Sequence, residues 1–132
     1  MMLEIKPIDE INELFSYKKP DPNTVIIVIT TAKYKYNFKP TLILDFKDVS
    51  RDEEGFITET HIKKLVSILP TISKAKTVFV GCDAGVSRSP AVALALATYL
   101  KQWHDFQEIA VRYPYLNNDV YEFVRERLSK IK

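Results

Sequence analysis

A short hydrophobic run at residues 77–80 leads into the only cysteine of the chain, Cys82, and then into an Ala/Leu-rich stretch that begins near Pro90. The run is typical of a buried strand and the stretch of a buried helix. A strand that feeds a tight turn and then a helix N-terminus gathers backbone N–H groups around one point, where the helix dipole also favours negative charge. The segment therefore predicts an α/β fold with an anion-binding loop between a strand and a helix.

Cys82 and Arg88 lie at the two ends of this loop. A cysteine beneath such a nest is expected to be held as its thiolate, because the local positive potential stabilises an anion. An arginine that closes the loop could bind two oxygens of one phosphate group. The plainer alternatives are a small buried cysteine and a surface arginine, but a cation in a first helical turn calls for a compensating anion. Together these features predict a nucleophile for phosphoryl transfer.

The composition indicates one domain, residues 1–132, because this length gives room for one core. A formal net charge of +2 provides no bulk field to recruit nucleic acid or a membrane. A lone cysteine allows no internal disulfide and favours a reducing compartment. No apolar run approaches the roughly 20 residues that span a bilayer, and the acidic N-terminal segment is unlike a signal peptide. We therefore expect a cytoplasmic protein with no membrane association.

Hydrophobic periodicity predicts strands that alternate with helices. The expected strands are residues 25–29, 41–46 and 77–80, and the expected helices are residues 8–17, 58–69, 89–103, 106–112 and 119–130. This alternation predicts a mainly parallel central sheet flanked by helices. Ligands bind beyond the carboxyl ends of the strands in such sheets. The loops that follow Ile29, Phe46 and Val80 are therefore expected at the binding edge, which agrees with the prediction from the loop itself.

The pattern Cys82-x5-Arg88-Ser89, with Gly85 third after the cysteine, resembles the signature loop of the cysteine-dependent protein tyrosine phosphatase superfamily. The order Ala-Gly-Val-Ser-Arg-Ser-Pro up to Pro90 is similar to its compact dual-specificity phosphatase-like branch. The resemblance extends over about residues 25–127 and is specific only around the loop. It implies a protein tyrosine phosphatase-like fold and a two-step hydrolysis of phosphate monoesters that needs no metal and no cofactor.

The resemblance also implies roles for the residues of the loop. Cys82 is the expected nucleophile, and Arg88 is the expected clamp on the phosphate oxygens. Ser89 resembles the hydroxyl residue that hydrogen-bonds the sulfur and helps the intermediate to break down, although helix capping is a plain alternative. The backbone N–H groups of the remaining loop residues are expected to bind the substrate phosphate: Asp83, Ala84, Gly85, Val86 and Ser87. We expect the side chain of Asp83 to point into solvent.

The leaving group needs a proton, which a carboxylic acid in a separate loop would supply. The candidates are Asp45, Asp48, Asp52, Glu53 and Glu54. Asp48 is favoured, because Phe-x-Asp at the end of this strand resembles the general-acid loop of several small phosphatases. Asp52 is the alternative, because its spacing from the cysteine resembles that of other dual-specificity enzymes. A solvated loop carboxylate is the plain alternative for either residue.

The chain departs from the family at Gly81, where relatives usually have a histidine that orients the loop and helps to hold the thiolate. We still expect activity, with a phosphorylated protein or peptide as the substrate. A phosphate-binding module without turnover stays open as an alternative. A sulfur-transfer domain is a third possibility, but the five-residue spacing to Arg88 argues against it.

Two further features bear on partners. The segment 33–39 interleaves lysines with aromatic residues and keeps the 5′-phosphates of RNA open as substrates, although the small net charge argues against nucleic acid. We expect this segment to form either the rim of the cleft or a solvated loop. His61 and His104 lack paired ligand spacing, which argues against a metal site. Asn117 and Asn118 resemble the turn before the last helix of the family, and we expect them to be structural.

Overall fold

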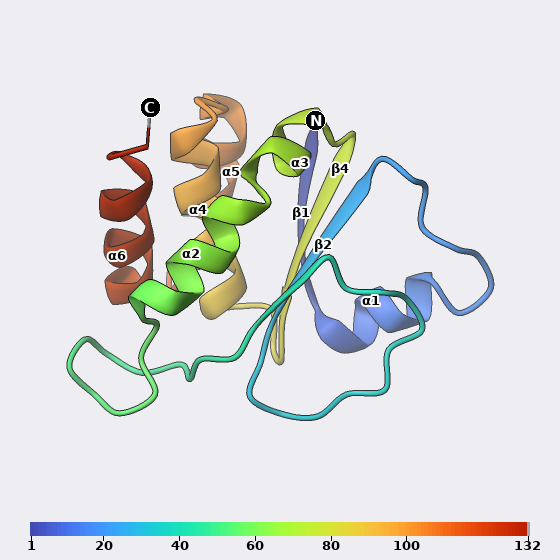
Figure 1. Ribbon diagram of the computed structural model, residues 1–132, viewed down its shortest axis with the longest axis horizontal. Coiled ribbons are helices and arrows are strands. Elements are labelled where there is room, and N and C mark those ends of the chain that lie inside the picture. Colours follow the sequence, from blue (N-terminus) through green and yellow to red (C-terminus); the bar gives the residue numbers. More distant parts are fainter. Residues whose placement is uncertain (132) are drawn as a thin grey trace.

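The computed structural model describes residues 1–131 and shows an α/β fold with a four-stranded sheet (Figure 1). The strands are β1 (Met2–Pro7), β2 (Thr24–Ile29), β3 (Leu42–Leu44) and β4 (Thr77–Cys82). The helices are α1 (Ile8–Leu14), α2 (Glu59–Ser67), α3 (Leu69–Lys74), α4 (Arg88–Tyr99), α5 (Trp103–Arg112) and α6 (Asn118–Leu128). The strand order is β1-β4-β2-β3, and every pairing is parallel. The predicted parallel sheet flanked by helices is therefore confirmed.

The two central strands, β2 and β4, are buried on both faces, which explains their continuous hydrophobic sequences. Alternate residues of a strand point to opposite faces. In β2, Val25 and Ile27 belong to the larger core, whereas Ile26 and Val28 belong to the smaller core on the other face. Both faces of the sheet therefore need a covering layer.

The larger core is covered by α4, which contacts the sheet on one side and α5 and α6 on the other. Residues Arg88 to Ala97 are all buried, because a helix enclosed in this way presents no open face to solvent. The smaller core is covered by α1, through Ile8 and Ile11, and by Phe38 from the segment that follows β2. Figure 1 shows α1 on the opposite side of the sheet from α4, α5 and α6.

The N-terminal strand β1 was not predicted. It is an edge strand, and Glu4 and Lys6 occupy alternate positions in its short sequence, so its hydrophobic signal is weak. Pro70, which was expected to follow a helix, instead lies in the first turn of α3, where the missing N–H breaks no helical hydrogen bond. The helix predicted over residues 58–69 is α2, which ends at Ser67, and the separate helix α3 that follows it was not predicted.

Several element boundaries also differ from the prediction. Helix α1 ends at Leu14 rather than residue 17, and β3 is confined to residues 42–44 instead of 41–46. Helix α4 stops at Tyr99, and the left-handed backbone of Lys101 (φ 57°) separates it from α5. The strand β4 continues through Cys82, so the cysteine still belongs to the sheet.

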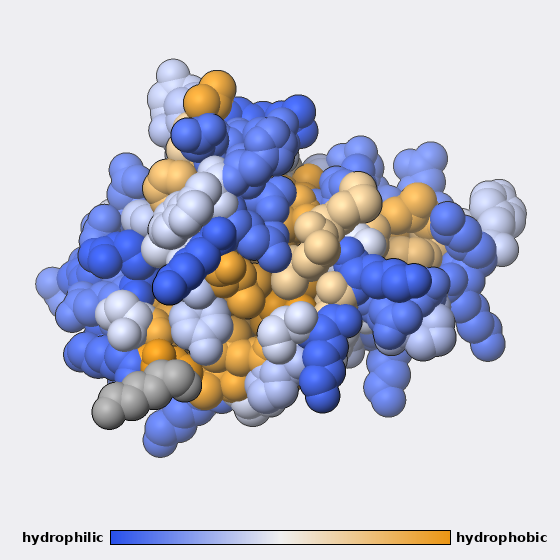
Figure 2. Space-filling model, turned by 90° about the horizontal axis from the view of Figure 1, so that it is seen from above, coloured by the Kyte–Doolittle hydropathy of each residue, from blue (hydrophilic) through white to orange (hydrophobic). Residues whose placement is uncertain are grey.

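All four strands run in one direction and end at the lower edge of the sheet in Figure 1. The loops after the strands therefore gather at that edge. Figure 2 shows the opposite end, where hydrophilic side chains surround a patch of hydrophobic ones. No helix within residues 1–131 is both long enough and apolar enough to cross a membrane.

Candidate active site

The loop between β4 and α4 is the centre to which the other loops at this edge connect. The Asp83 carboxylate hydrogen-bonds Thr30, which follows β2, and Arg88 hydrogen-bonds the Phe46 carbonyl, which follows β3. Gly85 lies against the backbone of Pro7, at the end of β1. The structure thus brings the predicted loop together with the ends of all four strands.

Cys82 is buried at the base of this loop, with 2% of its surface exposed. Its sulfur accepts a hydrogen bond from the Gly85 backbone N–H at 3.2 Å and lies 3.1 Å from the hydroxyl oxygen of Ser89. Donors directed at sulfur stabilise a thiolate more than a thiol. Such partners distinguish Cys82 from a cysteine that only fills space in a hydrophobic core.

Ser89 does not cap the helix. The residue that precedes α4 is Ser87, so Ser89 lies at the second helical position, and its fully buried hydroxyl faces the sulfur of Cys82. The capping alternative is therefore wrong for Ser89, and the contact with sulfur implied by the resemblance is present.

Two glycines let the loop pack closely on the N-terminal part of the chain. Gly85 has a φ of +72°, and a Cβ atom there would lie 2.5 Å from the backbone nitrogen of Pro7. At Gly81 a Cβ atom would lie 2.7 Å from the Cδ1 atom of Ile11 in α1. A larger residue at position 81 would require the end of the Ile11 side chain to shift and would press on the carbonyl oxygen of Lys6, 3.3 Å from that Cβ.

The guanidinium of Arg88 is buried, with 9% of the side-chain surface exposed. Its Nη1 donates to the carbonyl oxygen of Phe46 and its Nη2 to Oδ2 of Asp83, both at 2.8 Å. Its Nε is also buried but has no partner within residues 1–131. Buried N–H groups are almost always paired, so this donor marks a place where an oxyanion could bind.

The Asp83 side chain is exposed, as expected, with 40% of its surface accessible, but it does not point away from the site. Its Oδ1 accepts hydrogen bonds from the hydroxyls of Thr30, at 2.7 Å, and Tyr34, at 2.8 Å, while its Oδ2 pairs with Arg88. Burial alone would raise the pKa of this carboxyl, but the three hydrogen bonds and the arginine charge outweigh burial, so the pKa lies below its usual range. Asp83 is therefore ionised at neutral pH and supplies the anion that a cation in a first helical turn requires.

The backbone amides proposed for substrate binding lie together between β4 and α4. Ala84 and Val86 are exposed at the surface of the loop, and 53% of Val86 is accessible. The carbonyl of Ser87 accepts a hydrogen bond from the backbone N–H of Asn117, which ties the loop to the start of α6.

Asp48 is the candidate acid that the structure brings to the loop. Its Oδ1 accepts hydrogen bonds from the Ser87 hydroxyl, at 2.8 Å, and the Asn117 side-chain amide, at 2.9 Å. The same amide donates to the carbonyl of Val49, and the side-chain oxygen of Asn117 accepts from the N–H of Val120 at the start of α6. Asn117 is structural, as expected, and it also fixes the position of Asp48.

The other candidate acids lie in different surroundings. Asp45 is 3.0 Å from the Nε2 atom of His61, and this bond is the main reason that its pKa is lowered. Nδ1 of the same ring accepts from the backbone N–H of Thr58, so the ring proton is on Nε2 and is donated to Asp45. Asp52 has a left-handed backbone (φ 70°) in an exposed turn.

Two more candidates, Glu53 and Glu54, share that exposed turn. The carboxylate of Glu53 accepts from the backbone N–H of Ser50, so it stabilises its own turn. No hydrogen bond from Asp52, Glu53 or Glu54 to the cysteine loop is present within the described part of the chain. Among the five candidate acids, Asp48 is therefore the one whose carboxylate is hydrogen-bonded to the cysteine loop.

The segment 33–39 was expected to form either the rim of the cleft or a solvated loop, and it has features of both. Tyr34 and Tyr36 are stacked, with ring centroids 6.0 Å apart, and Phe38 is buried against α1. The lysines of the segment are exposed. Only the hydroxyl of Tyr34 reaches the cysteine loop, through Asp83, and this places the start of the segment at the rim of the site.

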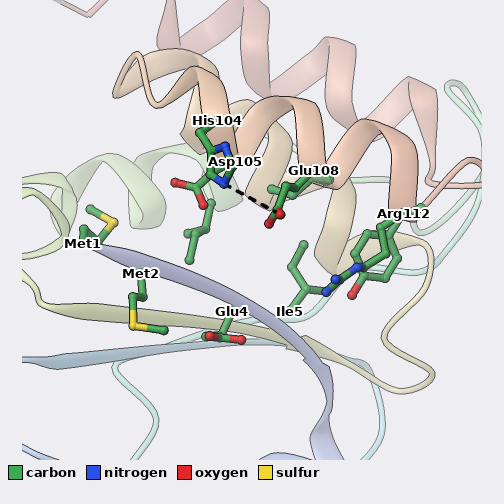
Figure 3. A pocket seen from close by; sticks show the side chains of 11 residues that line it. Met1, Met2, Glu4, Ile5, His104, Asp105, Glu108 and Arg112 are labelled. Carbon is green, nitrogen blue, oxygen red and sulfur yellow. Dashed lines mark ion pairs between the residues drawn. The ribbon is translucent and has the colours of Figure 1, made fainter.

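A hollow lies between β1 and α5, away from the cysteine loop (Figure 3). Its side chains carry charges of both signs, including Glu4, Glu108 and Arg112. His104 is exposed and lies 3.7 Å from Glu108. Within residues 1–131 no group of three or more His, Cys, Asp or Glu side chains could hold a metal ion.

Sequence reasoning missed the contributions of β1 and Thr30 and the part that the Asp83 side chain plays in the site. These depend on contacts between segments far apart in the chain, and neither spacing nor periodicity reports such contacts. The polar residues that follow β2 could have indicated the role of Thr30, because loops at the carboxyl ends of parallel strands lie at the binding edge.

No protein-family model, no curated protein and no solved structure matches the chain.

The close approach of Gly85 to β1 leads to a stability prediction. Gly85→Ala should lower the free energy of unfolding, because a left-handed alanine costs about 1–2 kcal/mol and its Cβ would also overlap the backbone at Pro7. Gly55→Ala is the matched control, since Gly55 also has a positive φ but faces only the flexible side chain of Lys47. Urea unfolding should show the larger loss for Gly85→Ala, and equal losses would contradict the contact with β1.

The lowered pKa of Asp83 predicts how its contribution to stability depends on pH. Because the pKa of Asp83 is lower in the folded state, its ionised form stabilises the fold at pH values above the unfolded-state pKa of about 3.9. This stabilisation is lost as the pH falls through the folded-state pKa. The difference in unfolding free energy between the wild type and Asp83→Asn should therefore be largest above about pH 4 and shrink below it. Urea unfolding from pH 6 down to pH 2.5 measures it, and a difference independent of pH would contradict the ionised network.

Proposed function

We propose that this protein is a cysteine-dependent phosphatase that hydrolyses phosphate monoesters through a cysteinyl-phosphate intermediate. The observation that carries the proposal is the pairing of Cys82 and Arg88 in one loop. The sulfur receives the Gly85 N–H, while the buried arginine keeps Nε without a partner within residues 1–131. A nucleophile beside a free guanidinium donor suits attack on a phosphorus atom whose oxygens are held.

The fold supports the resemblance to compact dual-specificity phosphatases. The loop follows a central strand of a parallel sheet and leads into a buried helix, α4, so its two ends are fixed by the core. A rigid loop at the carboxyl end of a sheet is a suitable frame for a preorganised oxyanion site.

In the first step the Cys82 thiolate attacks phosphorus, and the bond from phosphorus to the leaving oxygen breaks. Arg88 and the loop amides hold the non-bridging oxygens, and donors already in place need no reorganisation when the charge on these oxygens changes. Asp48 gives its proton to the leaving oxygen. Its place at Ser87 supports this role, because the carboxylate borders the loop that would hold the phosphate.

In the second step water attacks the phosphorus of the cysteinyl-phosphate, and the P–S bond breaks. The Asp48 carboxylate accepts a proton from that water, so the residue is restored to its acid form. Ser89 stabilises the departing thiolate by donating its hydroxyl hydrogen to the sulfur, and the 3.1 Å separation suits this bond. The products are inorganic phosphate and the free thiolate.

A direct test is the hydrolysis of p-nitrophenyl phosphate by the wild type and by Cys82→Ser, in the presence of a chelator and a reductant. Turnover should fall by at least about 10³-fold in the variant, because the nucleophile is removed. Binding of inorganic phosphate by Cys82→Ser serves as the control for an intact loop. Turnover that survives in the variant would refute Cys82 as the nucleophile. Binding without turnover in the wild type would instead identify a phosphate-binding module.

The assignment of the acid leads to a second prediction. With phenyl phosphate, whose leaving group needs a proton, Asp48→Asn should lower kcat by about 10²-fold or more. Asp52→Asn is the matched control, because Asp52 lies in the same connection but makes no hydrogen bond to the loop within the described residues, and it should stay within about twofold of the wild type. The loss in Asp48→Asn should shrink with p-nitrophenyl phosphate, whose leaving group needs less protonation. A larger loss in Asp52→Asn would reverse the assignment.

A further inference from the structure

Asp83 is an unexpected neighbour for a site that would bind an anion. Its carboxylate is next to the proposed nucleophile in the chain and pairs with the arginine that would bind phosphate. A negative charge at this position opposes a phosphate group unless it performs another task. Two opposite tasks are possible in principle: to compete with the substrate for the arginine, or to hold the arginine in place.

The donors of Arg88 distinguish these two tasks. A guanidinium has five N–H donors, and the described contacts use Nη1 for Phe46 and Nη2 for Asp83. Nε stays buried and has no partner within residues 1–131. Asp83 and Phe46 orient the two terminal nitrogens, and Nε is the buried guanidinium donor that they leave for a ligand, which favours the holding task.

The Asp83 carboxylate is itself held from another loop. Thr30 and Tyr34 donate to Oδ1 at 2.7 and 2.8 Å, so the carboxylate is tied to the segment after β2 as well as to Arg88. Burial, followed by the bond to Asp83 and its charge, raises the pKa of Tyr34 to about 12. The hydroxyl therefore remains a donor at neutral pH, and Asp83 is not free to follow a substrate.

We propose that Asp83 is a positioning residue, which holds Arg88 so that Nε faces the oxyanion, and that Thr30 and Tyr34 keep Asp83 in place. The inference rests on the proposed function for its catalytic meaning. Its structural part, a guanidinium fixed by Asp83, does not depend on turnover. The aromatic segment after β2 thereby affects phosphate binding without touching phosphate.

The test combines binding and spectroscopy on the full chain. Inorganic phosphate is the probe, and its affinity is measured by calorimetry. The side-chain Nε–H resonance of Arg88 is observed by ¹⁵N NMR, because a fixed guanidinium protects this proton from exchange with water. Asp83→Ala should weaken phosphate binding by about tenfold, the scale of one charge-assisted contact, and should broaden or abolish the resonance.

Asp83→Asn separates positioning from a general loss of structure. The amide oxygen can accept from Arg88, while the amide N–H groups donate to the hydroxyl oxygens of Thr30 and Tyr34. This variant should therefore recover part of the affinity and of the Nε–H resonance. Tighter phosphate binding by Asp83→Ala would instead identify Asp83 as a competitor and overturn the proposal.

Tyr34→Phe tests the link to the second loop with a conservative change. It should weaken phosphate binding by about two- to fivefold, because one of the two donors to Asp83 is lost. Tyr36→Phe is the matched control, since Tyr36 stacks on Tyr34 but its hydroxyl makes no hydrogen bond within the described residues. Equal effects of the two variants would overturn the role of Tyr34.

The outcomes also separate this inference from the proposed function. A wild type that has no turnover, but whose Arg88 resonance and phosphate affinity depend on Asp83, would retain the positioning role and refute the phosphatase. Turnover that is lost in Cys82→Ser but unchanged in Asp83→Ala would retain the phosphatase and refute the positioning role of Asp83. A wild type that binds no phosphate and whose Arg88 resonance is indifferent to Asp83 would overturn both.

Discussion

The buried guanidinium of Arg88 is the interaction on which the candidate site depends. Removing a charge from water costs several kcal/mol unless it is paired and hydrogen-bonded. Here the compensation comes from two different loops, through the Phe46 carbonyl and the Asp83 carboxylate. The end of β3 and the start of α4 are therefore joined by one side chain. Asp83 extends the network to Thr30, so three strand ends share a single charged cluster.

The N-terminal segment packs closely against the end of β4 and the loop that follows it. Helix α1 places Ile11 directly against Gly81, and the end of β1 lies against Gly85. At Gly85 a Cβ would overlap the backbone of Pro7, and the positive φ adds a conformational reason for glycine. At Gly81 a Cβ would displace the end of the Ile11 side chain. The close packing at Gly81 and Gly85 and the unpredicted strand β1 are therefore two aspects of one arrangement.

Local signals predicted the parts of the structure that depend on nearby residues. The continuous apolar strands β2 and β4, the buried helix α4 and the position of Cys82 at a strand end all follow from short stretches of sequence. The side-chain partners of Asp83 do not, because Thr30 and Tyr34 are separated from it by about 50 residues and meet it only through the parallel pairing of β2 with β4. The hydrogen bond between Asn117 and Asp48 could not be predicted either, because the two residues are 69 positions apart in the sequence. Pro70 shows a further limit, since a proline can either follow a helix or begin one.

The candidate site contains two carboxylates that lie in different surroundings. Asp83 faces the permanent charge of Arg88 and two hydroxyl donors, and its pKa is lowered, so it is unsuited to donating a proton near neutral pH. Within residues 1–131, the side chain of Asp48 accepts hydrogen bonds only from the neutral donors of Ser87 and Asn117, at the surface of the molecule. A pair of acids in such different environments is a common basis for separate structural and proton-transfer roles. For the proposed reaction, the general acid is therefore better sought in the carboxylate without a fixed cation than in the one that binds the arginine.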